Sequence, residues 1–432
     1  MNYLGDINPI AYLRDPVRNN ALFFMAANAI NALIGFFFWT LAARSYTVED
    51  IGRATALISA ANLVVIFAGL GMGIGVIRFL SEEKNKNALI NTAFTISEAT
   101  ALILSLIFIL GITVWSPALA FIYDNYLLIV MFIVFAVFSV IQSLLSFTFI
   151  AFGAARYSFY QSLIVGIKVI ILIFLVHLGI AGVFASFTLG PVTAVIIANI
   201  IFLPAVYRGY KFIPSFNRAI LNTIFRFSFG NYLGDIFKSL TGVLAALIII
   251  NLLGAETNAY FYVTWLISGI FFTVSYSINY SLIAATAPHP EQLRKQIVKA
   301  LKFALLILIP AIIVVYFAGG FILSLFGKEY AQGGLDLLHI LIVSSIPVAV
   351  NEIYIAVYRI RKQIKPIILI YGFIALFSIG AGYILLKILG LTGIGVAWLS
   401  AHCIMMMILF GINLKYIRSD PTPCREAKHR GL

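Results

Sequence analysis

Residues 225–253 read FRFSFGNYLGDIFKSLTGVLAALIIINLL, a stretch long enough to cross a bilayer as one helix. Its polar residues Asn231, Asp235, Lys238 and Thr241 follow one another at spacings of four, three and three, which places them on one stripe of a helix. A charged group in the middle of a membrane costs at least about 2.5 kcal/mol. The stripe therefore predicts a face turned toward protein or a water-filled cavity. It is either a functional site or a salt bridge that joins two helices.

The composition of the whole chain agrees with this first stretch. Of its 432 residues, 62% are hydrophobic and 10% are charged, whereas the apolar share of soluble domains is closer to half. Nothing between the apolar runs is long enough to form a soluble core. The first residues lack the pattern of a cleaved secretory signal, so we expect the first span to be retained. The predicted fold class is an all-α integral membrane protein.

Twelve apolar runs have the length of transmembrane helices. We predict spans at residues 20–44, 52–80, 88–115, 126–153, 159–178, 182–207, 225–253, 259–287, 298–320, 337–358, 366–388 and 393–417. Polar breaks separate them, and none of these breaks has the length of a domain.

Lysines and arginines are distributed unevenly over these breaks. The N-terminal segment, the even-numbered breaks and the tail hold most of them, and the odd-numbered breaks hold only Arg44, Arg53, Lys328 and Lys387. The positive-inside rule then predicts a multi-pass protein of the cell membrane with both termini in the cytoplasm. This topology and the attraction to anionic membrane lipids account for the net charge of +13, so no nucleic-acid partner is expected.

The second half of the chain repeats the first. LGIAGVFASF at residues 178–187 recurs as LGLTGIGVAW at residues 389–398, and Asn28 and Asn31 have counterparts 207 positions later at Asp235 and Lys238. We predict six-helix lobes at residues 1–206 and 207–417, with a cytoplasmic tail at residues 418–432. Because each half has an even number of spans, the two lobes run in parallel around a central cleft, a 6+6 arrangement. The four polar residues are expected to line that cleft.

Further polar residues fall inside predicted spans. Lys168 lies too deep in the fifth span to reach an interface easily, so it either binds a phosphate or forms a pair with Glu98 in the third span. Glu352, beside Asn351 in the tenth span, is expected to act as a gate or to contact a loop near the cytoplasmic face. These residues extend the candidate site beyond the stripe.

No metal, cofactor or redox site is expected. The histidines His177, His339 and His402 lie in different spans without a second ligand at metal-binding spacing. The two cysteines, Cys403 and Cys424, form no plausible disulfide framework. The glycines of GMGIG at residues 71–75 lie in an apolar span, which favours close helix packing or a local bend over a phosphate-binding loop.

Two longer stretches resemble a known family. They are WTLAARSYTVEDIGRATALISAANLVVIFAGLGMGIGVIRFLSE in the first half and LSLFGKEYAQGGLDLLHILIVSSIPVAVNEIYIAVYRIRKQ in the second. Both are similar to the polysaccharide-flippase, or O-antigen flippase-like, branch of the multidrug, oligosaccharidyl-lipid and polysaccharide exporter superfamily. The likeness covers nearly the whole chain, and the order of the motifs, the twelve spans and the duplicated halves carry it.

The resemblance implies a transporter that moves polyprenyl-phosphate- or pyrophosphate-linked sugars to the outer leaflet by alternating access between two lobes. In related proteins basic cavity residues bind the anionic headgroup, a role that falls here to Lys168 and Lys238, with Arg53 as a weaker candidate. The implied partners are the lipid-linked oligosaccharide, membrane lipids and glycosyltransferases or a polymerase of the same pathway. A proton or sodium ion is the expected coupling ion, and Glu98, Glu352 and Arg53 are the candidates for coupling or gating.

Two other functions compete with a flippase. A cation-coupled multidrug antiporter of the same superfamily would use Asp235 or Glu98 as its ion site. An integral membrane glycosyltransferase would need converging carboxylates or a large outer loop, and the sequence offers Asp124, Glu256 and Glu329 only in separate short breaks. A transporter is therefore the predicted class, and an enzyme is not expected.

Overall fold

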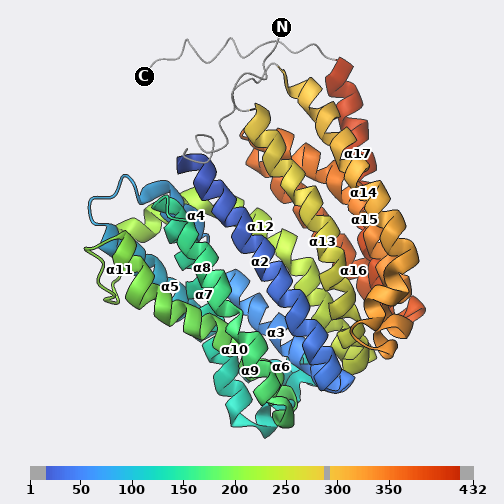
Figure 1. Ribbon diagram of the computed structural model, residues 1–432. Helices are drawn as coiled ribbons and strands as arrows, with labels where there is room; N and C mark the ends of the chain where they lie inside the picture. Colours follow the sequence, from blue (N-terminus) through green and yellow to red (C-terminus); the bar gives the residue numbers. More distant parts are fainter. Residues whose placement is uncertain (1–15, 287–291, 419–432) are drawn as a thin grey trace, which may run out of the picture.

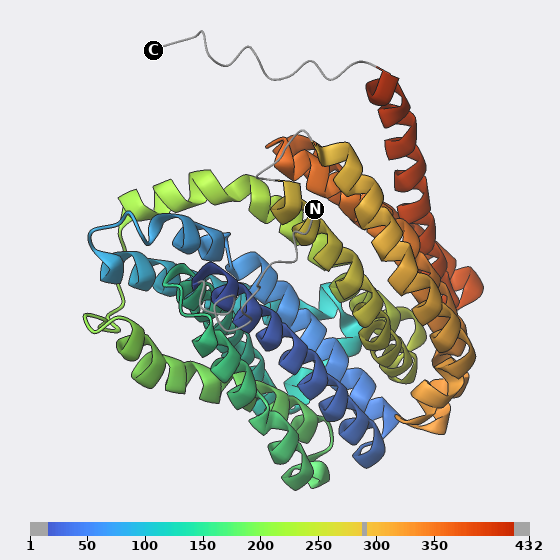
Figure 2. The same cartoon turned by 45° about the horizontal axis from the view of Figure 1, so that its top comes forward.

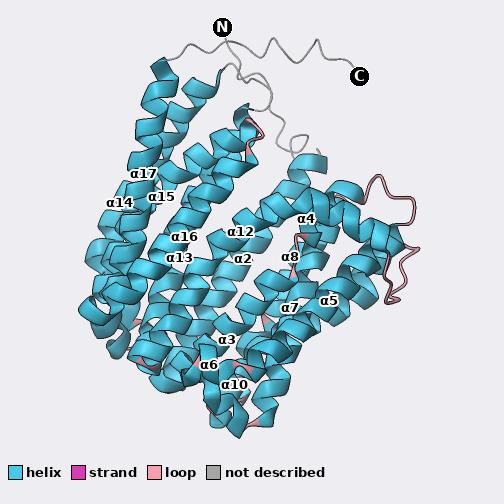
Figure 3. Cartoon of the chain, turned by 180° about the vertical axis from the view of Figure 1, so that it is seen from behind, coloured by secondary structure: helices cyan, strands magenta, loops and turns pink. Residues whose placement is uncertain are grey.

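The computed structural model describes residues 16–286 and 292–418, and within these ranges the chain is helical, with short loops and turns and no strand (Figure 3). Twelve of the described helices or helix pairs are long and apolar enough to cross a membrane. This confirms the predicted all-α class and the number of spans. The predicted tail lies outside the described residues except for Arg418, with which the last helix ends.

The helices from Arg218 onward are named the second lobe here, and those up to Val206 are named the first lobe. They are α2 (Pro16–Ser45), α3 (Val48–Ala68), α4 (Met72–Phe79), α5 (Lys86–Leu110), α6 (Ile112–Trp115), the 3₁₀ helix η1 (Pro117–Asp124), α7 (Tyr126–Ala151), α8 (Arg156–Val165), α9 (Ile167–Phe174), the 3₁₀ turn η2 (Val176–Leu178), α10 (Ile180–Ile197), the π-helical turn η3 (Ala198–Phe202) and α11 (Leu203–Val206).

The second lobe contains longer, unbroken helices. They are α12 (Arg218–Leu253), α13 (Ala255–Thr286), α14 (Leu293–Ser324), α15 (Lys328–Ile360), α16 (Ile364–Leu389) and α17 (Thr392–Arg418). The lobes stand beside each other, the first in blue to green and the second in yellow to red (Figures 1 and 2). α12 packs on α16 and α13 of its own lobe and also on α3 and α4 of the other.

The second predicted span is wrong in its extent. It was expected to run over residues 52–80, but α3 ends at Ala68 and a turn separates it from α4. The turn places Gly71 at φ +71°, and a Cβ there would lie 2.9 Å from Cβ of Ser228 in α12. A Cβ on Gly73 would lie 2.2 Å from the ring of Phe147 in α7. The GMGIG motif therefore forms a bend and close helix contacts, the interpretation that its apolar setting favoured.

The two lobes touch closely at the end of the molecule where the odd-numbered breaks lie. A Cβ on Gly52 would lie 1.8 Å from the backbone oxygen of Ala255, so only glycine allows α3 to approach the start of α13. The amide of Asn258 donates to the backbone oxygen of Gly52 at 2.8 Å. Arg44 donates to the backbone oxygens of Leu325 and Ser324, both at 2.8 Å, and so satisfies carbonyls at the C-terminal end of α14.

The segment between the lobes is fastened to α5. The amide of Asn91 donates to the backbone oxygen of Lys211 at 2.8 Å, and the backbone N–H of Ser215 donates to Oγ1 of Thr95 at 3.1 Å. Tyr210 donates to Oδ1 of Asn199 at 2.9 Å, and burial together with the charge of Glu98 raises the pKa of its hydroxyl. The hydroxyl therefore stays protonated, and the segment follows the polar face of α5.

Candidate transport site

The polar stripe of α12 lies near the middle of the helix. α12 runs from Arg218 to Leu253 and starts seven residues before the predicted span, so Asp235 and Lys238 lie about midway along it. Asn28 and Asn31 lie near the middle of α2.

Asp235 is exposed and Lys238 is half-buried, and no salt bridge joins these two described residues. Nζ of Lys238 instead lies 3.5 Å from the centroid of the Tyr276 ring in α13, a cation–π contact. The charges that act on Asp235 are those of Arg359, in the last turn of α15, and Lys238. The alternative in which the stripe is a mutual salt bridge is therefore wrong in this conformation. The side chain of Asn231 lies outside the described part.

Glu352 lies deeper in the second lobe and is held by hydrogen bonds. Its side chain is 3% exposed. Its Oε2 accepts from the amide of Asn279 in α13 at 2.7 Å, and its Oε1 accepts from the hydroxyl of Tyr371 in α16 at 2.8 Å. The expected contact with a loop is wrong, because both partners lie in helices. These bonds fix the position of the Glu352 side chain between α13 and α16.

A small cavity connects Lys238 to Glu352. Its volume is about 10 Å³. The residues that line it are Phe237, Lys238, Thr241, Tyr276, Glu352, Tyr371, Ile374, Trp398 and His402. A space of this size is on the order of that needed for one water molecule. It can hold water or a small ion beside Glu352, whereas a sugar must bind elsewhere.

Lys168 lies inside the first lobe and is only 8% exposed. Its Nζ lies 4.2 Å from the centroid of the Phe187 ring and 5.2 Å from that of Phe38. No salt bridge joins Lys168 to Glu98, both of which are described, so the predicted pairing of these two residues is wrong. The lysine is enclosed by aromatic rings and is not brought to Asp235 and Lys238.

The asparagines of α2 are exposed but belong to the other lobe. The amide of Asn31 donates to Oγ of Ser162 in α8 at 2.9 Å, and Asn28 is exposed on the same helix. α2 packs chiefly on α8 and α9, and α12 packs on neither. The structure therefore gathers Asp235, Lys238 and Glu352 in one lobe and leaves Asn28 and Asn31 on the other.

The remaining candidates lie apart from this group. Arg53 forms an ion pair with Glu49 one turn earlier, and its Cζ lies 5.3 Å from the centroid of the Phe121 ring, at the end where the lobes meet. Glu98 is half-buried on α5, and its Oε1 is buried without a hydrogen-bond donor among the described residues. Across residues 16–286 and 292–418, no group of three or more potential metal ligands occurs.

Several residues of the site were missed from the sequence. The contact of the Tyr276 ring with Lys238 arises from the packing of α13 on α12, which the spacing within one helix does not show. Asn279 and Tyr371 gave no signal, because a single polar residue in an apolar span does not show which carboxylate it will meet. Arg359 was counted only among the basic residues of a break, yet its charge acts on both Asp235 and Glu352.

Residues 41–333 match the family described as polysaccharide biosynthesis protein, which is more than half of the chain. The chain belongs to this family. The comparison with curated protein sequences gives no significant match.

Solved structures show the same fold at low sequence identity. An inward-facing MATE-family multidrug resistance transporter of the MOP superfamily is 16% identical, with a TM-score of 0.68 over 91% of this chain and 98% of the other. A MOP superfamily transporter from Pyrococcus furiosus is 14% identical, with a TM-score of 0.63 over 93% and 95%. The lipid II flippase MurJ in an inward closed conformation is 16% identical, with a TM-score of 0.62 over 91% and 87%.

The fold and the family together define the broad class. The chain is a multi-pass membrane protein of the polysaccharide biosynthesis family with a MATE-like arrangement of helices. The solved structures that share this fold include multidrug transporters and a lipid II flippase.

Proposed function

We propose that the protein is a flippase that carries a polyprenyl-phosphate- or pyrophosphate-linked oligosaccharide across the cell membrane by alternating access, for the assembly of cell-surface polysaccharide. The observation that carries the proposal is the state of Lys238. This cation lies near the middle of α12, is half-buried and contacts an aromatic ring instead of a carboxylate. It is therefore available to a phosphate, which an ammonium group binds as a point charge. Membership of the polysaccharide biosynthesis family supports the substrate class.

The proposed substrate path runs between the lobes. Asp235 and Lys238 line it from α12, and Asn28 and Asn31 line it from α2, where their amides can hydrogen-bond to sugar hydroxyls. The lipid tail stays in the bilayer while the headgroup crosses. Lys168 is left out of the path because its ammonium is enclosed by Phe38 and Phe187. The lobe boundaries at residues 206 and 207 are part of the same proposal.

The orientation of the path follows from the contacts between the lobes. Gly52, Asn258 and Arg44 close the end with the odd-numbered breaks, where basic residues are scarce. By the positive-inside rule this is the outer end, so we place both termini in the cytoplasm and propose that the path opens toward the cytoplasm in this conformation. Cysteines placed near Asp124 or Lys328 should react from outside in a background lacking the native cysteines, and those near Lys84 or Lys362 only after permeabilisation. The reverse labelling would overturn the orientation.

Glu352 is the proposed coupling residue. It is a buried carboxylate beside a space that fits one water molecule or small ion, and Lys238 lines the same space. A phosphate that binds Lys238 changes the charge next to Glu352, which links substrate binding to uptake of a proton or sodium ion. Glu98, with its unpartnered carboxylate oxygen, is the candidate in the other lobe.

A cation-coupled multidrug antiporter is the second candidate function, and one observation favours it. Asp235 is exposed, and Tyr280 of α13 is 59% exposed, so a carboxylate and an aromatic ring are both available to an organic cation. In the flippase proposal Lys238 of α12 binds the substrate, whereas in the antiporter Asp235 of the same helix binds it.

The experiment that separates the two functions follows two substrates in the same reconstituted vesicles. A fluorescent lipid-linked oligosaccharide is tested for access to a membrane-impermeant reagent, and uptake of an organic cation is measured beside it. A flippase exchanges the lipid-linked sugar between leaflets and does not accumulate the cation. Cation uptake that is abolished by Asp235→Asn, with no movement of the lipid-linked sugar, would reject the flippase in favour of the antiporter.

A further inference from the structure

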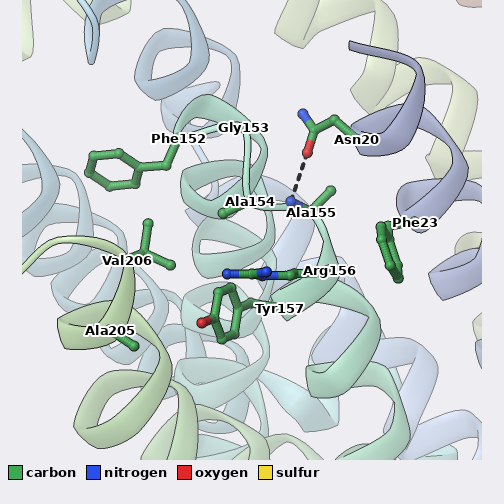
Figure 4. Close-up of a pocket in the computed structure, with 10 residues that line it drawn as sticks. All are labelled: Asn20, Phe23, Phe152, Gly153, Ala154, Ala155, Arg156, Tyr157, Ala205 and Val206. Carbon is green, nitrogen blue, oxygen red and sulfur yellow. Dashed lines mark hydrogen bonds between the residues drawn. The ribbon is translucent and has the colours of Figure 1, made fainter. Parts of the chain in front are cut away.

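A second, larger cavity lies in the first lobe, away from the α12 stripe. Its volume is about 390 Å³, within the range of small-molecule sites. It is formed by the start of α2, the turn between α7 and α8, and α11 (Figure 4). The lining residues are Asn20, Phe23, Phe152, Gly153, Ala154, Ala155, Arg156, Tyr157, Ala205 and Val206. None of these residues has a role in the proposed path.

Arg156 is the charged group of this cavity. Figure 4 shows its side chain lying beside the ring of Tyr157 and pointing toward the wall made by Ala205 and Val206. Its Cζ lies 5.0 Å from the centroid of the Tyr157 ring. Within the described residues no carboxylate lies in salt-bridge distance of its guanidinium. The planar guanidinium is thus held by stacking while its N–H donors remain available.

A second cation stands next to the same wall. Nζ of Lys86, the first residue of α5, lies 5.6 Å from the centroid of the Phe152 ring. Lys86 also has no salt bridge within the part of the chain that the structure describes. Phe152 in turn stacks on Tyr207, with ring centroids 5.7 Å apart. One cation, Arg156, therefore lines the hollow, and a second, Lys86, lies against the ring of Phe152, which is part of its wall.

The cavity is built on a fixed frame. Oδ1 of Asn20 accepts from the backbone N–H of Ala155 at 2.7 Å, and its Nδ2 donates to the backbone oxygen of Ile150 at 3.3 Å. These two bonds fasten α2 to the turn that leads into Arg156. Tyr157 is further packed against Phe149 and Phe202, with centroids 5.7 and 5.3 Å away. The fold therefore holds the turn that carries Arg156 and the ring on which its guanidinium lies.

The place of the cavity in the fold indicates its ligand. Lys86 and Arg156 begin α5 and α8, at the end of the bundle that carries the basic breaks. Aromatic and basic side chains together are typical of the membrane–water interface, and basic pockets between helices on the cytoplasmic side bind lipid headgroups. We propose that this cavity binds the phosphate group of an anionic lipid of the cytoplasmic leaflet, with Arg156 as its main ligand and Lys86 as a second positive charge. The site is separate from the transport path.

The test counts lipids retained by the purified full-length protein in native mass spectrometry. The probes are phosphatidylglycerol, phosphatidylcholine, polyprenyl phosphate and inorganic phosphate. Arg156→Gln removes the charge, and Ala205→Phe fills the hollow while keeping the charge. Arg361→Gln is the matched control, because Arg361 is an exposed arginine of an even-numbered break in the other lobe. Arg156→Lys keeps the charge without the planar fork of donors.

We expect the unmodified protein to retain one phosphatidylglycerol in preference to phosphatidylcholine. Arg156→Gln and Ala205→Phe should each weaken this retention by about tenfold, the effect of losing a charge-assisted hydrogen bond. Arg361→Gln should retain as much phosphatidylglycerol as the unmodified protein. Arg156→Lys should retain less than the unmodified protein and more than Arg156→Gln. Stronger retention of polyprenyl phosphate with the same pattern of variants would identify the carrier lipid as the source of the phosphate.

Three results would overturn the proposal. The first is that Arg156→Gln and Arg361→Gln lose the same amount of bound phosphatidylglycerol. The second is that Arg156→Gln and Ala205→Phe retain as much of this lipid as the unmodified protein. The third is that the protein binds inorganic phosphate but no lipid. If Ala205→Phe does not fold, Arg156→Gln and Arg156→Lys still decide the outcome. Lipid retention is measured without transport, so failure here and failure of the flippase proposal are distinguishable.

Discussion

Lys168 and Lys238 are lysines within apolar spans of the two lobes, and the structure gives them different surroundings. The ammonium of Lys168 lies against the rings of Phe38 and Phe187, and no carboxylate of the described residues lies within salt-bridge distance of it. Lys238 lies over a tyrosine and lines a small space together with Glu352, Thr241 and His402. A charge inside a span is therefore not by itself a transport site. The polar groups that surround it decide its role.

The largest effect should follow from breaking the polar network of the second lobe. Glu352→Ala removes the side-chain acceptor of Asn279 and Tyr371. The buried Tyr371 hydroxyl is left without this acceptor, at a cost of about 1–3 kcal/mol, while Nδ2 of Asn279 keeps its bond to the backbone oxygen of residue 352 at 3.1 Å. We expect a lower melting temperature in detergent and loss of ion-dependent transport. Glu352→Gln should recover most of the stability but not the ion dependence. Glu329→Ala, an exposed acid on the same helix, serves as the control.

Glu352 is not the coupling residue if transport depends on the proton or sodium gradient to the same extent in Glu352→Gln and in the unmodified protein. In that case Glu98 becomes the first candidate for coupling, and Glu98→Gln should be measured next.

A smaller effect should follow from changing the lysine of the first lobe. Lys168→Met keeps the length of the side chain and removes a desolvated charge, so we expect unchanged or increased stability and nearly normal transport. Lys168→Ala leaves a void between Phe38 and Phe187 and should cost about 2–3 kcal/mol of unfolding free energy. Thermal unfolding and the leaflet assay on both variants check this. Loss of transport in a stable Lys168→Met protein would restore Lys168 to the substrate path.

The smallest effect concerns the relation between Asp235 and Lys238. Because no salt bridge joins them, Asp235→Asn should not strand a buried cation. We expect the effects of Asp235→Asn and Lys238→Met on stability to add to within about 0.5 kcal/mol in the double variant. Denaturation in detergent of the two single variants and the double variant measures this coupling. A double variant more stable than Asp235→Asn alone would show that the pair forms a salt bridge after all.

The sequence predicts the fold well and the site only in part. Apolar length and the absence of a soluble core were enough for twelve spans, because in a membrane the backbone must satisfy its own hydrogen bonds. The turn after Ala68 was missed because Gly69 and Gly71 look alike whether they pack inside one helix or separate two. The surroundings of Lys168 could not be predicted either, since Phe38 and Phe187 lie in other spans and only tertiary packing brings them to it.

The stripe of α12 shows the same limit. Helical spacing placed Asp235, Lys238 and Thr241 on one face, and Lys238 and Thr241 do line one cavity. The spacing could not identify Tyr371, Glu352 or His402 on the opposite wall, because those contacts arise from the packing of α15, α16 and α17. A pattern within one helix gives its functional face, but it does not give the residues that complete the site.

The most direct test of the account measures how fast a fluorescent lipid-linked oligosaccharide becomes accessible in the opposite leaflet of vesicles that contain Lys238→Ala. Lys387→Ala, which removes an exposed lysine from an odd-numbered break, is the matched control. We expect Lys238→Ala to fold normally but to move the lipid-linked oligosaccharide at least about tenfold more slowly than the unmodified protein. Lys238→Arg should move it faster than Lys238→Ala, and Lys387→Ala should move it at the normal rate. A folded Lys238→Ala protein that moves the lipid-linked sugar at the normal rate would contradict the proposed role of Lys238.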